Sequence, residues 1–218
     1  MAESPAKQPA SNYDLQVDIG KRLFMEYDQN ALIRKYQLSA DRQWIYLAYL
    51  AIPCRISRTD GSIEEMAEGV WQPCRRFNTV MTIYDLLCYH TGATPPNLAN
   101  SWCTVGSFII TGVQNASDFA KGYAALFDGH TDTLQSACLE LGGTIQNTIA
   151  GADLVCRCQV TPFFPVLLQF WSGDEEFPAK LQLLWDRNPT SFLQFETTFY
   201  LQGDLLDRLK QHYIRKTS

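Results

Sequence analysis

Three consecutive acids, Asp174, Glu175 and Glu176, are the residues whose types and spacing point most directly to chemistry. They follow an apolar run that ends at Trp171, and Phe177 comes directly after them. Neighbouring side chains on an extended chain point to opposite sides, so at most two of these carboxylates can converge on one ion. The run therefore needs acids from elsewhere in the chain to complete a metal site.

Asp186 and Glu196 are the acids expected to complete such a site. With the acidic run they would give an oxygen-rich centre for Mg²⁺ or Ca²⁺. Crowded carboxylates also raise one another's pKa, as acid–base catalysis requires, so a small divalent-cation-dependent enzyme is one expectation. The alternative is a solvated turn whose acids accept hydrogen bonds from backbone N–H groups, while Phe177 anchors the turn to the core.

Cys156 and Cys158 are the candidate metal ligands. They are two positions apart on a predicted strand, so both side chains face the same way. With Cys54 or Cys138 nearby they could hold zinc or a cluster. Zinc motifs, however, pair their cysteines as C-x₂₋₄-C twice over, and no C-x-x-C occurs in this chain. Packing as small buried hydrophobes is the other interpretation of this pair.

Two tryptophans in predicted loops, Trp71 and Trp102, could line a pocket for a flat ligand such as a tetrapyrrole. Neither a glycine-rich nucleotide-binding motif nor a nucleophile motif accompanies them, so no catalytic residue is assigned. The residues predicted to bind a ligand are Trp102, Trp171, Asp174, Glu175, Glu176, Asp186 and Glu196.

Hydrophobic periodicity predicts the elements that must position these side chains. Helices are expected at about 13–28, 31–38, 78–91, 117–127, 132–141 and 196–213, the first of them amphipathic through Leu15, Ile19, Leu23 and Tyr27. Strands are expected at 43–57, 62–66, 153–160, 163–171 and 180–186, with a hairpin turn at Asp60-Gly61. The fold class is thus α+β, with mostly antiparallel strands flanked by helices in a single domain at 13–218 and a flexible segment at 1–12.

Composition excludes several classes of function. The net charge is −5 and the pI is about 5.2, without a basic stripe, which argues against nucleic acid and anionic membrane surfaces as partners. No apolar run reaches the roughly 18 to 20 residues that cross a bilayer. The start of the chain lacks the pattern of a signal peptide, so a cytoplasmic location with seven free thiols is expected, and this cysteine usage fits an anaerobe.

The stretch "FPVLLQFWSGDEEFPAKLQLLWD" at 164–186, followed by "FLQFET", resembles the C-terminal signature of an uncharacterised domain family of anaerobic bacteria and archaea. Supporting matches, in the same order as in the family, are "CRISRTDGSIE", "MTIYDLLCYHTGA", "SWCTVGSF" and "LELGG", so the resemblance covers about 40–210. The chain departs from the pattern in "FLQFET", where Leu-Pro-Thr-Glu is usual, and in Trp185-Asp186, where Phe-Asp is usual.

Some members of this family are similar in arrangement to appendages of corrinoid-type iron–sulfur domains. The resemblance therefore implies a non-catalytic binding or accessory domain in a metallocofactor pathway, with a metalloprotein or a small ligand as its partner. It implies no catalytic residue and no firm cofactor. A purely structural interaction module remains a third expectation.

Overall fold

The computed structural model describes residues 12–108, 120–147 and 151–217. Its helices are α1 (Asn12–Glu26), α2 (Gln29–Tyr36), α3 (Phe77–Cys88), α4 (Lys121–Phe127), α5 (Thr131–Glu140) and α6 (Phe195–Thr217), with 3-10 turns η1 (Val105–Phe108) and η3 (Pro189–Ser191). Its strands are β1 (Ser39–Ala40), β2 (Trp44–Tyr49), β3 (Ile52–Ser57), β4 (Ile63–Ala67), β5 (Val70–Pro73), β6 (Trp102–Cys103), β7 (Gly143–Ile145), β8 (Leu154–Thr161), β9 (Phe164–Trp171) and β10 (Lys180–Asp186).

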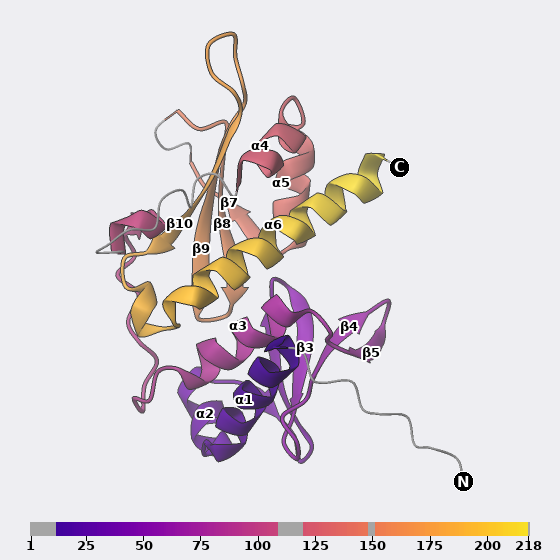
Figure 1. Ribbon diagram of the computed structural model, residues 1–218, viewed down its shortest axis with the longest axis vertical. Coiled ribbons are helices and arrows are strands. Elements are labelled where there is room, and N and C mark those ends of the chain that lie inside the picture. The colour runs from indigo at the N-terminus through magenta and orange to yellow at the C-terminus, as the bar shows by residue number, and fades with distance from the viewer. Residues whose placement is uncertain (1–11, 109–119, 148–150, 218) are drawn as a thin grey trace.

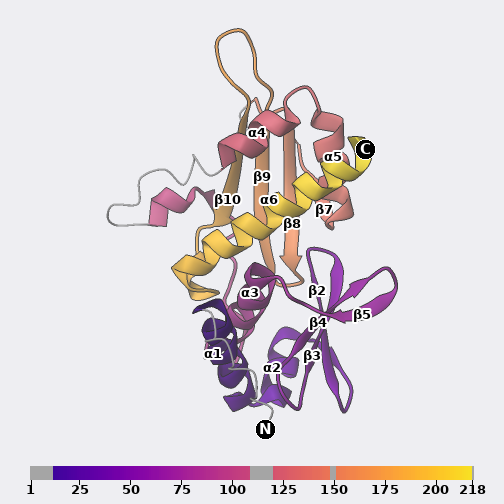
Figure 2. The same cartoon turned by 45° about the vertical axis from the view of Figure 1, so that its right-hand side comes forward.

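The described strands form two antiparallel sheets, which confirms the α+β class and the antiparallel pairing. The first sheet is a simple meander in the order β1-β2-β3-β4-β5. The second sheet has the order β6-β10-β9-β8-β7. Helices α4, α5 and α6 lie over one face of the second sheet, and α1, α2 and α3 lie beside the first (Figures 1 and 2).

One continuous hydrophobic core joins the two halves, so the chain is a single domain. The predicted strand at 43–57 is in fact a hairpin, because Leu50 and Ala51 take left-handed φ values of 49° and 61°. Leu50 is fully buried, and its N–H donates to the carbonyl of Val160 in β8 at 2.8 Å. Burial and this hydrogen bond hold a turn that non-glycine residues adopt at a cost. The hairpin tip thereby connects the first sheet to the second.

The Asp60-Gly61 hairpin forms between β3 and β4 as predicted, with Gly61 at φ +75°. The hydroxyl of Tyr84 in α3 donates to the Gly61 carbonyl at 2.6 Å and fixes the turn against the helix. Trp71 and Trp102 were expected in loops, but they lie in the short strands β5 and β6. Of the helix expected at 117–127, residues 117–119 lie outside the described part of the chain and the remainder contains α4.

Helix α6 is attached to α3 at two places. The carboxylate of Asp85 in α3 accepts from the backbone N–H of Gln194 at 2.6 Å, directly before α6 begins. Further along, Asp204 accepts from the Thr79 hydroxyl at 2.7 Å and from Arg208 Nε at 3.2 Å. Both charged side chains are almost fully buried. Among the described residues, no helix is long and apolar enough to cross a membrane.

Candidate metal centre

Three buried cysteines meet where α5 packs on the edge of the second sheet. Cys156 and Cys158 alternate with Arg157 on β8, so both side chains point to the helix-covered face of the sheet. Cys138 comes from α5, whose buried residues Leu134, Ala137 and Cys138 follow the spacing of a helix face. The sequence separates Cys138 from the other two cysteines, and only this helix-on-sheet packing brings them together.

The turn after α5 is what places Cys138. Gly142 adopts φ +74°, a left-handed conformation that commonly ends a helix, and Gly143 begins β7 immediately afterwards. In the register of the sheet, Gly143 pairs with Cys158 and Ile145 pairs with Cys156. A helix that ends at Glu140 and reverses within two residues into this edge strand must lie over β8, with Cys138 facing inward.

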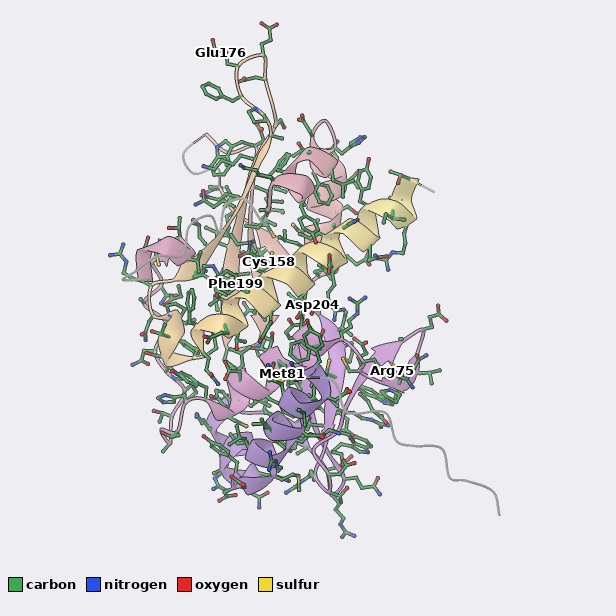
Figure 3. The ribbon with its side chains drawn as sticks, viewed as in Figure 1. Arg75, Met81, Cys158, Glu176, Phe199 and Asp204 are labelled. Atoms are coloured by element: carbon green, nitrogen blue, oxygen red, sulfur yellow. The ribbon has the colours of Figure 1, made fainter. Side chains whose placement is uncertain are left out.

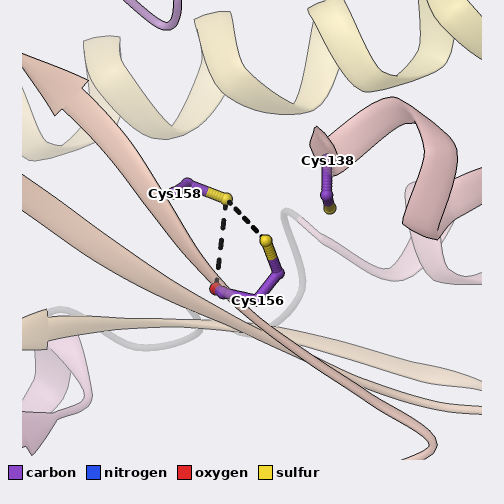
Figure 4. A group of neighbouring side chains, drawn as sticks. All are labelled: Cys138, Cys156 and Cys158. Carbon is purple, nitrogen blue, oxygen red and sulfur yellow. Dashed lines mark hydrogen bonds between the residues drawn. The ribbon is translucent and has the colours of Figure 1, made fainter. Parts of the chain in front are cut away.

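The three sulfur atoms lie within 4.8 Å of one another. Figure 4 shows Cys138 approaching from the helix and the other two thiols rising from the strand. The S–H group of Cys158 donates to Cys156 Sγ at 3.9 Å. All three residues have an exposed fraction of 0%. The group is therefore closed to water in this conformation.

Mutual hydrogen bonding makes the three thiols unequal. Hydrogen bonds from Cys138 and Cys158, with a further one from the backbone N–H of Thr144, lower the pKa of Cys156 to about 4 against the cost of burial. The hydrogen bond to Cys156, the bond to Cys158 and burial raise the pKa of Cys138 well above its usual value. In Cys158 the bond with Cys138 lowers the pKa, but the bond to Cys156 and burial outweigh it and raise the pKa well above 9.

Gly143 forms the wall of this group nearest the sheet edge. A Cβ atom at this position would lie 2.4 Å from Cys156 Sγ and 2.6 Å from the Cys138 carbonyl oxygen. Real Cβ atoms essentially never approach other atoms so closely, so any side chain here would push the sulfurs or the helix end away. The glycine therefore lets the backbone of β7 close directly over the thiols.

The spacing of the Cys156 and Cys158 sulfurs fits one ion. Thiolates bound to a metal at about 2.3 Å lie about 3.8 Å apart in tetrahedral geometry and about 4.0 Å apart in trigonal geometry. The distance of 3.9 Å between Cys156 and Cys158 lies between these values. Among the residues that the structure describes, no fourth histidine, cysteine or acid joins the group. A cluster of several irons would need its cysteines further apart than a single ion does.

The acidic run occupies the connection between β9 and β10, at the tip where Figure 3 labels Glu176. Asp174, Glu175 and Glu176 are all exposed. Asp174 Oδ1 accepts from the backbone N–H groups of Glu176 at 2.8 Å and Phe177 at 2.7 Å. These bonds, first that from Phe177, lower the pKa of Asp174, whereas crowding was expected to raise it. Phe177 is 66% exposed, so it does not anchor the turn to the core as expected.

The two acids expected to complete an oxygen site lie elsewhere. Asp186 is at the far end of β10 from the turn, about 20 Å away for six residues of strand. It is 1% exposed and accepts from the backbone N–H groups of Ala99, Asn100 and Asn188 at 2.9, 2.7 and 3.1 Å. Glu196 is exposed in the first turn of α6. The structure does not bring these acids to the run at 174–176.

Trp102 and Trp171 do come together, on the outer face of the second sheet. Both are partly buried against a small apolar cluster of Ala152, Val155 and Leu167. The ammonium group of Lys180 lies 4.9 Å from the centre of the Trp171 ring. The sheet itself separates this face from the helix-covered face that carries the cysteines.

Sequence reasoning named Cys156 and Cys158 and left their third partner open between Cys54 and Cys138. The structure places Cys138 with them. Cys54 lies in β3 of the first sheet. The signal in the sequence was the combination of a cysteine in the last turn of a helix, a Gly-Gly reversal and a C-x-C strand. All seven cysteines are free thiols in the structure, as expected.

No curated protein and no solved structure matches the chain. A family described as a domain of unknown function (DUF3786) matches residues 28–208. This region contains both sheets, the acidic turn and the three cysteines, and it leaves out α1. The match covers most of the chain, and the protein is therefore a member of the DUF3786 family.

Proposed function

We propose that this protein is a non-catalytic accessory domain that binds one thiophilic metal ion between Cys138, Cys156 and Cys158. The observation that carries the proposal is the convergence of three fully buried sulfur atoms within 4.8 Å of one another. Thiolates are soft ligands that select metals such as Cu(I) and zinc. The resemblance of the signature region to appendages of iron–sulfur domains supports service in a cytoplasmic metallocofactor pathway of an anaerobe.

Burial of the donors supports holding an ion rather than catalysis with it. A catalytic zinc site keeps a position open for water or substrate. Here the sulfurs have no exposed surface, and the backbone at Gly143 closes over them. An ion in this centre would cross-link α5 to β8, so its binding free energy would add to the stability of the fold.

The donor set favours Cu(I) over zinc. Structural zinc sites are almost always four-coordinate, whereas the group among the described residues offers three thiols and excludes water. Soft thiolates suit Cu(I), and the reducing interior of an anaerobe keeps copper in that state.

The test is an anaerobic titration of the reduced, metal-free protein with Cd²⁺, Zn²⁺ and Cu(I) buffered by a coloured Cu(I) chelator. We expect one ion per chain, with thiolate-to-metal charge-transfer absorption for Cd²⁺ and tightest binding for Cu(I). Cys138→Ala, Cys156→Ala and Cys158→Ala should each lose this binding. Cys88→Ala is the matched control, because Cys88 is also buried but lies in α3.

Two results would contradict the proposal. The first is a wild-type protein that binds none of the three ions. The second is binding that survives all three substitutions while Cys88→Ala lowers it. If the protein bound zinc more tightly than Cu(I), the metal centre would be confirmed and only the preference for Cu(I) would be wrong. Circular dichroism of each variant confirms that it remains folded.

A further inference from the structure

The metal centre is closed, so an ion can reach it only if an element of the fold moves. Cys138, Cys156 and Cys158 have no exposed surface. Strand β8 is held on both sides, because it pairs with β7 and with β9. Helix α6, which lies over the same face of the sheet, buries eleven residues, whereas α5 buries three, namely Leu134, Ala137 and Cys138. Elements with few buried side chains open at a lower free energy, so α5 is the wall of the centre that we expect to move.

Glu140 connects the last turn of α5 to α6. One carboxylate oxygen, Oε1, accepts a hydrogen bond from Arg215, and the other, Oε2, lies 2.7 Å from Nδ1 of His212. The Arg215 side chain is 63% exposed, and ion pairs in water contribute little to stability. The contact with His212 differs, because this ring is buried. Glu140 is two residues after Cys138 on the same helix, so a movement of α5 that takes Cys138 away from β8 also breaks this contact.

His212 is a polar residue on an apolar helix face. It follows Leu205 and Leu209 at helical spacing on the side of α6 that faces the core, and it is 2% exposed. Among the described residues, neither ring nitrogen has an aligned hydrogen-bond partner, so the close approach of Glu140 is the polar contact that this ring has. A buried polar group without a hydrogen bond destabilises the conformation that buries it. Water would hydrate both ring nitrogens if α5 moved away.

We propose that the contact between Glu140 and His212 is a latch that controls access to the three cysteines, an inference that rests on the metal-binding function proposed above. In the closed conformation the carboxylate of Glu140 offsets part of the cost of burying the His212 ring. When α5 lifts, the contact breaks, the ring gains water, and Cys138 leaves the two sulfurs of β8. The stability of this contact therefore sets how fast an ion enters and leaves the centre.

Labelling of the thiols with N-ethylmaleimide tests the latch in the reduced, metal-free full chain, with mass spectrometry to measure the rate at each cysteine. Glu140→Ala should raise the rates at the three cysteines of the centre by about tenfold, because it leaves the buried ring without a polar contact. His212→Leu should lower these rates, because leucine suits the apolar face and leaves no buried polar atom unpaired. The double variant should be labelled as slowly as His212→Leu alone.

Two controls separate opening of α5 from general loss of stability. Cys88 is the internal control, because it is also buried but lies in α3, and its labelling rate should be the same in every variant. Glu64→Ala is the matched control variant. Glu64 forms an ion pair with Arg55 in the first sheet, far along the chain from α5, and its loss should leave the rates at the metal centre unchanged.

Metal uptake distinguishes failure of the latch from failure of the metal-binding function. Stopped-flow mixing with Cd²⁺ should show faster binding by Glu140→Ala and slower binding by His212→Leu than by the wild type. Unchanged labelling rates in both variants would overturn the latch, and so would an equal increase at Cys88 and at the centre. A wild type that binds no ion but shows the expected labelling rates would overturn the metal-binding function and confirm the latch as a control of thiol access.

Discussion

Cys158 donates its S–H group to the sulfur of Cys156, 3.9 Å away on the same strand. This bond, with the corresponding one from Cys138, gives the centre one thiol of low pKa and two of high pKa. Cys156 is therefore the first of the three thiols to lose its proton. Metal binding at this centre must displace the protons of the other two, because thiolates are the ligands.

Metal affinity should rise with pH because the ion competes with these protons. Between about pH 5 and pH 8 Cys156 is already deprotonated, while Cys138 and Cys158 are still protonated. We expect release of about two protons per ion and a gain in affinity of about a hundredfold per pH unit in this range. Titration calorimetry in buffers of different ionisation enthalpy measures the number. Release of three protons would show that Cys156 is not the low-pKa thiol.

Gly143→Ala should disrupt the centre because its Cβ would overlap Cys156 Sγ and the Cys138 carbonyl. The substitution should abolish stoichiometric metal binding and lower the melting temperature. Gly122→Ala is the matched control, since Gly122 is in α4 and a Cβ there meets nothing within 4 Å. Alanine in a helix is better than glycine by about 1 kcal/mol, so the control should be neutral or slightly stabilising. Equal effects of both substitutions would contradict the role of Gly143.

The regular elements could be predicted from the sequence wherever a local pattern determined them. The Asp60-Gly61 turn, α5 and the strands β8 to β10 follow from turn residues and periodicity alone. The turn at Leu50 and Ala51 could not, because it depends on burial against β8 rather than on turn-forming residues. The exposure of Ile19 could not be predicted either, because a periodic pattern identifies an apolar line on a helix without showing whether other residues cover it.

Two of the three cysteines in the metal centre could be predicted together, and the third could not, for the same reason. Strand alternation places Cys156 and Cys158 on one face, and this local rule needs no tertiary information. The position of Cys138 depends on how α5 folds back over the sheet after Gly142, which the sequence indicates only through the Gly-Gly pair. The acidic run is a more distinctive sequence motif than the cysteines. It nevertheless lies far from Asp186, because the turn and Asp186 are at opposite ends of β10.

In the acidic turn, Asp174→Ala should lower the melting temperature more than Glu175→Ala, because only Asp174 accepts two backbone hydrogen bonds. The pKa of Asp174 is lowered in the folded state, so its contribution is present above its ordinary pKa of about 4 and is lost as the pH falls through the lowered value. The difference between the variants should therefore shrink in acid. Thermal melts at pH 7 and pH 3 measure it, and a constant difference would contradict this assignment.

Phe177→Ala should change the free energy of unfolding by no more than about 0.5 kcal/mol, as for other surface substitutions, because the ring is 66% exposed. Urea unfolding of this variant beside Phe170→Ala gives a matched comparison. Phe170 lies on the neighbouring strand and is fully buried, so its loss should cost about 3 to 5 kcal/mol. A large effect of Phe177→Ala would mean that the turn is packed in solution.

Asp204 and Arg208 should couple the long helix to the first half of the molecule. Asp204 is 2% exposed, its Oδ2 atom lies 3.2 Å from Arg208 Nε, and the Thr79 hydroxyl of α3 donates to the same oxygen. Removing one member of a buried charge pair costs about 3 to 5 kcal/mol where the other is left uncompensated. Here Arg76 lies 3.6 Å from Asp204 and Glu65 lies 3.6 Å from Arg208, so each remaining charge keeps one partner. Asp204→Ala and Arg208→Ala should therefore each destabilise the protein in urea unfolding, by less than this amount.

The double substitution Asp204→Leu with Arg208→Met provides the control, because it removes both charges and fills their space with apolar groups. Such replacements are often neutral or stabilising, so the double variant should be more stable than either single variant. If the two single effects instead added in the double variant, the pair would contribute through packing alone. In Asp204→Leu the Thr79 hydroxyl loses its hydrogen-bond acceptor. Thr79→Val in that background should recover stability, because it leaves no buried donor unpaired.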